Sequence, residues 1–380
     1  METLADPRSA ARRSRGLYLV CALCVVTCAG LFAGFGIRSD PVDNEVFNLY
    51  AGARLGPQEL YHPESFRAVA ESLGAKVIEA RFYYCRMPYY AVFTKPLCWL
   101  PYPAAVVVWR SIQMLAIAAA VFLWPGWKPA MAMVAMVSLP AVCVITLGQD
   151  VALVFLSVAA TVALARRGRP FLAGLVFSWC LAKPHLVVFV PLAMLAVGYF
   201  RLLAGAAAGT CLQILLSFAV APSSWPSQWF SILSNSQMHP YLHGMPGMRA
   251  LIQTGPGTAL AALIGASLAV AIWTLARRRP LEEAIAYALA AGIVANLHSY
   301  LVDCILLIPV ITLAVSSRRI FERGLGVFLA TPVPYLALLF GVPVLLQTGI
   351  LTLVSFAWMW RPANRERQQL QPEMGREGTL

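Results

Sequence analysis

Charged residues are scarce in this 380-residue chain. Asp, Glu, Lys and Arg together make up 12% of the sequence, whereas hydrophobic residues make up 59%. A soluble domain carries about 25% charged residues, so the composition excludes an ordinary soluble protein. The mean hydropathy of +0.70 predicts instead an all-α membrane protein that crosses the bilayer many times.

Other familiar features are also missing. No glycine-rich nucleotide-binding motif of the GxxxxGK[ST] or GxGxxG type occurs. The nine cysteines fall mostly within apolar runs, where they are typical of small core residues, so no disulfide framework is expected. The net charge of +12 could indicate nucleic-acid binding. That interpretation fails if the positive charges flank membrane spans on one side, because such charges set the orientation of the chain.

Apolar runs predict about twelve spans, several of them shorter than the ~20 residues that cross a bilayer straight. They are residues 17–37, 103–124, 129–147, 151–165, 170–182, 186–200, 202–221, 255–276, 283–297, 301–316, 325–341 and 343–358. The first run has no clear cleavage site, so we interpret it as an uncleaved span. We expect 1–16 to be a cytoplasmic N-terminal segment, 17–360 the transmembrane domain and 361–380 a disordered cytoplasmic tail.

Arginine and lysine set the predicted orientation. ARRGR at 165–169 and ARRRP at 276–280 fall on the same side of the span pattern, and the short loops on the other side are nearly free of positive charge. Positive residues concentrate in cytoplasmic loops. We therefore expect both termini in the cytoplasm of a bacterium and the loops 38–102 and 222–250 outside its cytoplasmic membrane. Outside the inner loops and 38–102, the only positive residues are Arg110, Lys183 and Arg249.

The first outer loop contains segments typical of a membrane surface. Residues 66–82 have mixed amphipathic character and predict a helix that lies on the membrane. The stretch YYAVFTKPLCWLPYP at 89–103 is too short and too rich in proline to span. We expect it to form a re-entrant or interfacial hairpin, with Trp99 and Tyr102 at headgroup depth.

Nearly all the remaining unusual polar residues fall on the predicted outer side. They are Asp40, Asp43, Glu45, Gln149, Asp150, Lys183, His185, His239, His243, His298, Tyr300 and Asp303. Ionisable residues within a membrane domain are costly and are commonly functional. Their shared side is the strongest functional indication in the sequence.

Structural explanations remain open for individual residues. Asp43 and Glu45 could be solvated loop acids, Asp150 could be the N-cap of the following span, and Lys183 could reach toward the interface. His298 and Asp303 could form a structural hydrogen bond, although they are out of phase on a regular helix.

A metal site is not predicted. His239 and His243 are four residues apart, but nearby Pro240, Gly244 and Pro246 argue against one helix that carries both. No acidic pair with metal-binding spacing occurs either. We expect no cofactor and no obligatory divalent metal.

Outer-face carboxylates, a lysine, histidines and apolar hairpins suit the transfer of a sugar from a lipid-linked phosphate. A carboxylate can take the proton of the acceptor hydroxyl as general base. Cationic side chains can neutralise the departing phosphate. The apolar hairpins can hold a prenyl chain at the membrane surface.

At these residues the sequence resembles glycosyltransferase family 87 of the GT-C superfold, the polyprenyl-phosphate-sugar-dependent mannosyltransferase-like membrane proteins. The matching stretches are FNLYAGARL at 47–55, LY at 60–61, RMPYYAVFTKPLCWLPYPAAVVVW at 86–109, the GQD-to-KP block within 148–195 and HSYLVDCILLIPV at 298–310. The resemblance implies a GT-C-like bundle of about twelve transmembrane helices, an interfacial first outer loop and a catalytic acid in that loop.

The resemblance also implies roles for individual residues. The catalytic base is Asp43 or Glu45: Asp43 stands farther from Tyr50 than the family's acid usually does, whereas Glu45 has the better spacing but the less usual side chain. Lys183 matches the family's KP lysine and is assigned to the donor phosphate. Weaker candidates for the same phosphate are His185, His298 and Arg86. Acceptor-binding or supporting residues are Asp303, Tyr300, Gln149, Asp150, His239 and His243.

The expected partners are a polyprenyl-phosphate-linked sugar, a glycolipid, glycan or protein acceptor, and the lipid bilayer. Two alternatives stay open. In a secondary transporter, ionisable residues should lie near mid-membrane on broken helices of related halves, whereas here they cluster at span ends. The second alternative is a degenerate, noncatalytic membrane scaffold of the same fold.

Overall fold

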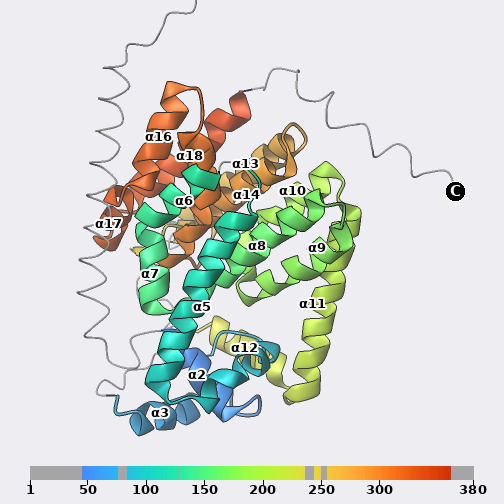
Figure 1. Cartoon of the computed structure of the whole chain (residues 1–380), viewed down its shortest axis with the longest axis vertical. Helices are drawn as coiled ribbons and strands as arrows, with labels where there is room; N and C mark the ends of the chain where they lie inside the picture. The colour runs from blue at the N-terminus through green and yellow to red at the C-terminus, as the bar shows by residue number, and fades with distance from the viewer. Residues whose placement is uncertain (1–44, 76–83, 127, 236–243, 250–254, 361–380) are drawn as a thin grey trace, which may run out of the picture.

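The computed structural model describes residues 45–75, 84–126, 128–235, 244–249 and 255–360 (Figure 1). This part of the chain is built from helices, with no strand among its elements. The elements are α2 (Glu45–Leu55), α3 (Pro63–Ser72), α4 (Pro88–Thr94), η2 (Lys95–Trp99), α5 (Tyr102–Leu123), α6 (Lys128–Val137), α7 (Leu139–Leu147), α8 (Val151–Arg166), α9 (Pro170–Phe177), η3 (Ser178–Ala182), η4 (Pro184–Val187), α10 (Phe189–Val197), α11 (Phe200–Val220), α12 (Trp225–Leu233), α13 (Gly255–Ala276), α14 (Leu281–Ala295), η8 (Leu301–Leu307), α15 (Ile308–Val315), α16 (Ile320–Ala330), α17 (Val333–Leu339) and α18 (Val344–Met359).

Several of these helices are apolar enough for a membrane. Among the described residues, α5, α11 and α13 are each long enough to cross it alone. The helices α6 and α7 pass the same test together, although the chain bends by 62° between them. Five shorter apolar segments, built from α8, α9 with η3, η4 with α10, η8 with α15, and α18, accompany them. These helices identify a membrane protein, and the count of about twelve spans stays a prediction.

The predicted spans from residue 103 onward each fall on a helix or on consecutive helices, and the span 17–37 lies outside the described residues. The runs predicted as spans at 129–147 and 325–341 are each divided between two helices. The run 129–147 breaks at Ser138, whose side chain caps α7 by accepting a hydrogen bond from the backbone of Ala141. The run 325–341 is divided between α16 and α17, because Pro334 at the start of α17 lacks the backbone donor that a continuous helix needs.

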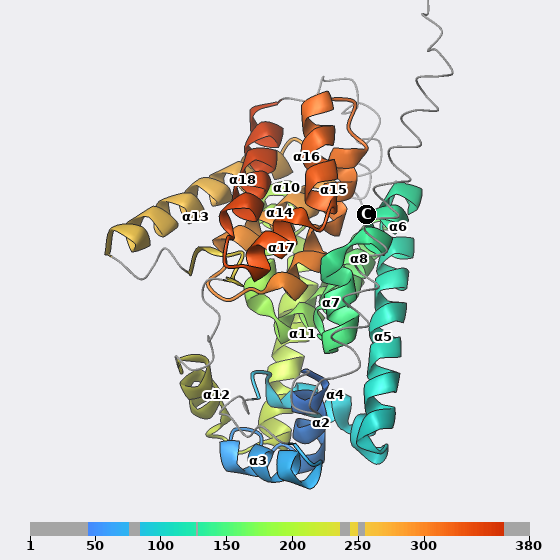
Figure 2. The ribbon, with the colours of Figure 1, turned by 90° about the vertical axis from the view of Figure 1, so that its left-hand side faces the viewer.

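The helices form two parts. In Figures 1 and 2, α2, α3 and α12 lie together at one end, and most of the other helices pack into a bundle above them. The long helices α5 and α11 run from the bundle to this end part. Each part has its own apolar core: one around Phe47, Tyr84 and Trp109, the other around α8 and α14.

The first outer loop is more helical than the sequence predicts. The surface helix expected at 66–82 is α3, which begins at Pro63 and ends at Ser72; residues 76–83 lie outside the described residues. The proline-rich stretch forms α4 and η2 and then turns into α5. Trp99 is 75% exposed, whereas Tyr102 is buried with its ring against that of Tyr50. The headgroup depth of both rings stays a prediction.

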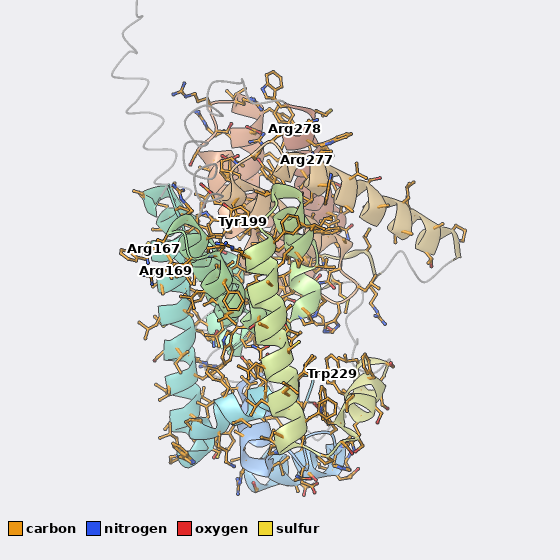
Figure 3. The ribbon with its side chains drawn as sticks, turned by 90° about the vertical axis from the view of Figure 1, so that its right-hand side faces the viewer. Arg167, Arg169, Tyr199, Trp229, Arg277 and Arg278 are labelled. Atoms are coloured by element: carbon orange, nitrogen blue, oxygen red, sulfur yellow. The ribbon has the colours of Figure 1, made fainter. Side chains whose placement is uncertain are left out.

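The arginine-rich turns lie away from the end part. Figure 3 shows Arg167 and Arg169 at the α8–α9 turn, and Arg277 and Arg278 after α13, all on the bundle side of Trp229 in α12. All four arginines are exposed. The fold therefore separates the short positively charged turns from the outer-loop helices, as the orientation prediction requires. The orientation itself stays a prediction.

Candidate functional site

Glu45 begins α2, at the junction between the end part and the bundle. The rest of α2 is fixed by burial: Val46, Phe47 and Leu49 are almost completely inaccessible. Tyr50 donates a hydrogen bond to the carbonyl oxygen of Leu100, 3.1 Å away. The Glu45 side chain keeps 21% of its surface exposed, more than the other charged side chains that it contacts.

The turn between α7 and α8 carries Gln149 and Asp150. Gly148 ends α7 in the left-handed conformation with φ at 66°, which favours glycine. Its carbonyl oxygen accepts a hydrogen bond from the indole of Trp109 at 2.8 Å. A Cβ at this position would also collide with Val46 of α2. The turn is thereby held directly against the start of α2.

Asp150 is not the side-chain cap that the sequence allowed, because its carboxylate makes no capping hydrogen bond to α8. Instead it accepts two hydrogen bonds from Arg86, from Nε at 2.7 Å and from Nη2 at 2.9 Å. Arg86 Nη2 also lies 3.3 Å from Glu45 Oε1. Asp150 is completely buried and Arg86 nearly so. Two-pronged contacts of this kind fix the guanidinium plane.

Lys183 lies between η3 and η4 and is buried rather than extended toward an interface. Its ammonium group donates to Gln149 Oε1 at 2.9 Å and to Asp303 Oδ1 at 3.0 Å. The second oxygen of Asp303 accepts from the backbone N–H of Tyr300 at 2.8 Å. Asp303 therefore holds the lysine and the start of η8 together.

The polar side chains form one ion cluster, made of Glu45, Arg86, Gln149, Asp150, Lys183 and Asp303. Gln149 Nε2 lies 3.4 Å from Glu45 Oε2, and Lys183 Nζ lies 3.6 Å from Asp150 Oδ1. The cluster holds three carboxylates and two cations, which leaves one formal negative charge when all are ionised. Burial of charges at this density requires such pairing.

The pKa values of two carboxyl groups in the cluster, Glu45 and Asp150, shift in opposite directions. Burial raises the pKa of Glu45 above its ordinary value, and Arg86 opposes the shift only in part. Burial also acts on Asp150, but Arg86 and Lys183 hold the pKa of that carboxyl below its ordinary value. Their surroundings therefore favour the charged form of Asp150 and disfavour the charged form of Glu45.

The family model of glycosyltransferase family 87 matches residues 87–302, which is more than half of the chain. The chain belongs to glycosyltransferase family 87. Membership makes it a glycosyltransferase. No curated protein and no solved structure matches the sequence. The matched residues include three cluster members, Gln149, Asp150 and Lys183, whereas Glu45 and Asp303 flank the match.

Two histidines of this family 87 chain lie beside the cluster. The rings of His185 and His298 are 5.7 Å apart, and the ring of Tyr300 lies 5.0 Å from that of His298. Asn296 joins the two segments, because its side chain donates to the carbonyl oxygen of His185 at 3.1 Å and accepts from the backbone of His298 at 2.8 Å. The structure thus brings together residues that are more than a hundred positions apart.

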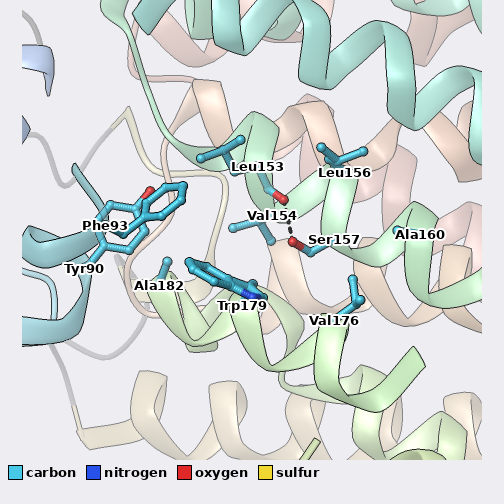
Figure 4. A pocket seen from close by; sticks show the side chains of 10 residues that line it. All are labelled: Tyr90, Phe93, Leu153, Val154, Leu156, Ser157, Ala160, Val176, Trp179 and Ala182. Carbon is cyan, nitrogen blue, oxygen red and sulfur yellow. Dashed lines mark hydrogen bonds between the residues drawn. The ribbon is translucent and has the colours of Figure 1, made fainter. Parts of the chain in front are cut away.

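An apolar groove runs next to the cluster of the family 87 protein. It has a volume of about 340 Å³ and is lined by Tyr90, Phe93, Leu153, Val154, Leu156, Ser157, Ala160, Val176, Trp179 and Ala182 (Figure 4). Ala182 immediately precedes Lys183. The rings of Phe93 and Trp179 meet edge to face at 4.9 Å and are both partly exposed.

Three sequence-predicted site residues, Asp43, His239 and His243, lie outside the described residues of the family 87 chain. Among the described residues, no group of three or more His, Cys, Asp or Glu side chains could hold a metal ion. The expectation of a metal-free reaction stays a prediction.

Sequence reasoning missed one cation of the family 87 protein that lies near the site. Arg249 ends the described segment 244–249, which binds the carbonyl oxygen of Asn296 through the backbone of Met248. The sequence contained a signal for Arg249, because this residue, like Lys183, is an isolated positive residue outside the arginine-rich loops.

Proposed function

We propose that the protein transfers a sugar, mannose or a related hexose or pentose, from a polyprenyl-phosphate donor. The acceptor is a glycolipid, glycan or protein hydroxyl on the outer face of the bacterial cytoplasmic membrane. The observation that carries this proposal is the ion cluster, in which a reachable carboxylate stands beside two buried cations. Family membership supplies the reaction class.

Glu45 acts as the general base. It removes the proton of the acceptor hydroxyl while the acceptor oxygen forms a bond to the anomeric carbon. The bond between that carbon and the phosphate oxygen breaks, and its electron pair leaves with the phosphate. The direct displacement inverts the anomeric configuration. Asp43 remains the alternative base.

Lys183 and Arg86 stabilise the phosphate as negative charge develops on it. Asp303 and Asp150 keep these cations charged and fixed, since each accepts a short hydrogen bond from its partner. Preorganised charges in a poorly hydrated site stabilise a leaving anion better than water does. His185 and His298 lie where they can donate to the same phosphate, and Tyr300 supports His298.

The apolar groove supports a prenyl carrier rather than a water-soluble donor. Its lining is almost entirely hydrocarbon and aromatic, and its end at Ala182 adjoins the proposed phosphate-binding lysine. Burial of each chain CH₂ contributes about 0.8 kcal/mol, so a few isoprene units would hold the donor in place. The phosphate would then sit at the boundary between groove and cluster.

The test is sugar transfer by the purified protein in lipid nanodiscs, with polyprenyl-phosphate mannose and candidate acceptors. We expect Lys183→Ala and the double change Asp43→Asn, Glu45→Gln to reduce turnover at least a hundredfold, the usual scale for loss of a general base or an oxyanion partner. Lys95→Ala is the matched control, because Lys95 donates only to the carbonyl oxygen of Ala53 and lies outside the cluster.

Unchanged turnover in the cluster variants would show that the site is assigned wrongly. Gel filtration and thermal unfolding accompany each variant, because removal of Lys183 leaves buried carboxylates unpaired. The transporter alternative predicts substrate flux into proteoliposomes without any glycosylated product, and such flux would overturn the proposal.

A further inference from the structure

The short segment 244–249 is fixed against the wall of the site. Met248 donates its backbone N–H to the carbonyl oxygen of Asn296 at 3.0 Å, and Gln347 of α18 donates to the carbonyl oxygen of Gly247 at 2.9 Å. A Cβ at Gly247 would collide with that same Asn296 carbonyl, so glycine permits the close approach. Met245 and Met248 of the same segment are buried.

This anchoring places Arg249 at the edge of the ion cluster. The anchor residue Asn296 begins the turn that carries His298, Tyr300 and Asp303. Arg249 follows Met248 directly, and its charge acts on the Tyr300 hydroxyl. Arg249 therefore follows directly on the backbone that contacts the 296–300 segment, and it is the only charged residue of 244–249.

Among the described residues, the two cluster cations have counter-ions, whereas Arg249 has none. Arg86 is bound by Asp150 and Glu45, and Lys183 is bound by Asp303 and Gln149. Within the part of the chain that the structure describes, Arg249 makes no ion pair and no hydrogen bond, although it is partly buried. A partly buried cation without a counter-ion is unfavourable unless an anion binds there.

We propose that Arg249 binds the phosphate of the lipid-linked donor together with Lys183 and Arg86. The proposal rests on the proposed function, and it explains how a dianionic or monoanionic phosphate can enter a cluster that already carries net negative charge. Arg249 supplies the positive charge that the cluster lacks. Its planar guanidinium can donate two parallel hydrogen bonds to phosphate oxygens, which a lysine cannot do.

Equilibrium binding of polyprenyl phosphate, without a sugar, tests the proposal independently of catalysis. The proteins compared in nanodiscs are wild type, Arg249→Ala and Arg249→Lys. We expect Arg249→Ala to weaken binding at least about tenfold, the scale of one charge-assisted hydrogen bond. Arg249→Lys should lie between the two, and the salt dependence of binding should be weaker in the alanine variant.

Arg54→Ala is the matched control. Arg54 ends α2 in the end part and contacts Ser72 on the exposed surface, so we expect the affinity to stay at the wild-type value. Thermal unfolding of each variant separates lost binding from lost folding, and the lysine variant keeps the test valid if the alanine variant unfolds.

Three results would overturn the proposal, and they differ in what else they affect. Wild-type affinity in Arg249→Ala would remove Arg249 from the phosphate site while leaving the proposed function intact. An unchanged affinity combined with a raised KM for an anionic acceptor would assign Arg249 to the acceptor instead. Failure of the wild-type protein itself to bind polyprenyl phosphate would overturn the proposed function together with this inference.

Discussion

At the scale of single residues, Glu45 differs from the other carboxylates of the cluster. Its hydrogen bonds to Arg86 and Gln149 are the longest in the cluster, at 3.3 and 3.4 Å, and its side chain is 21% exposed. Asp150 and Asp303 accept hydrogen bonds of 2.7 to 3.0 Å and are almost fully buried. Under the proposed function, Glu45 is therefore the member that an incoming phosphate replaces on Arg86.

Because Glu45 and the phosphate compete for Arg86, loss of the Glu45 charge is expected to increase the affinity for polyprenyl phosphate. Glu45→Gln removes the anion that competes for Arg86 and keeps the size of the side chain. We expect polyprenyl phosphate to bind this variant about tenfold more tightly, since nearby charges at a partly buried site interact by more than 1 kcal/mol. Isothermal titration calorimetry measures the change. Equal or weaker binding than in wild type would contradict the competition.

The pH dependence of transfer should report the same carboxylate. Burial raises the pKa of Glu45 above its ordinary value of 4.5, and a base acts only when it is deprotonated. We therefore expect kcat/KM to fall as the pH decreases through a value above 4.5, with activity complete on the alkaline side. An acid limb at or below 4.5 in the pH–rate profile would exclude Glu45 as the base.

The sequence predicted all six members of the cluster as site residues but not the way they pair. Their predicted outer side follows from the arginine-rich loops, and the outer side itself stays a prediction. The sequence does not predict which distant segments meet: of the two interpretations left open for Asp150, the local helix cap is wrong, and the carboxylate binds Arg86, 64 positions earlier. Local patterns contain no information on such long-range contacts, and tertiary pairing overrode the local preference.

At the scale of elements, α9 and α11 approach each other through glycines. A Cβ on Gly174 would collide with the backbone of Leu202, and a Cβ on Gly205 would collide with the carbonyl oxygen of Phe171. Gly209, one turn beyond Gly205, faces Ser178 in the same way. Small residues four apart allow membrane helices to pack closely, where dispersion and weak polar contacts supply the attraction.

Alanine at this interface should destabilise the protein. We expect Gly205→Ala to lower the thermal midpoint by several degrees, because forcing an extra methyl group into a packed interface costs about 1–3 kcal/mol. Gly265→Ala in α13 is the control, since a Cβ there meets no atom within 4 Å. Its midpoint should stay the same or rise. A similar midpoint for both variants would show that the glycine contact contributes nothing.

The sequence predicted where apolar helices occur better than where they break. Runs of hydrophobic residues located α5, α11 and α13 to within a few positions. They could not locate the break at Ser138, because Ser138 and Pro140 are compatible either with a kinked span or with a new helix. The 62° bend is decided by packing against other helices, which periodicity does not record.

At the scale of the whole molecule, the charge distribution predicts an orientation that labelling can test. In a cysteine-free version of the protein, we expect Glu71→Cys in α3 to react with a membrane-impermeant maleimide added to intact cells. Arg167→Cys should react only after the membrane is opened. Both positions are exposed on the protein surface, so reaction of both from one side would contradict the positive-inside assignment.

The members of the ion cluster are synthesised at different times. Glu45 near one end of the chain meets Asp303 through Lys183, and ribosomes add roughly 5–20 residues per second. On the order of tens of seconds therefore separates the synthesis of the first and last members. During that interval Lys183 has been synthesised but Asp303 has not, so the ion pair between them can form only after the later residue has been added.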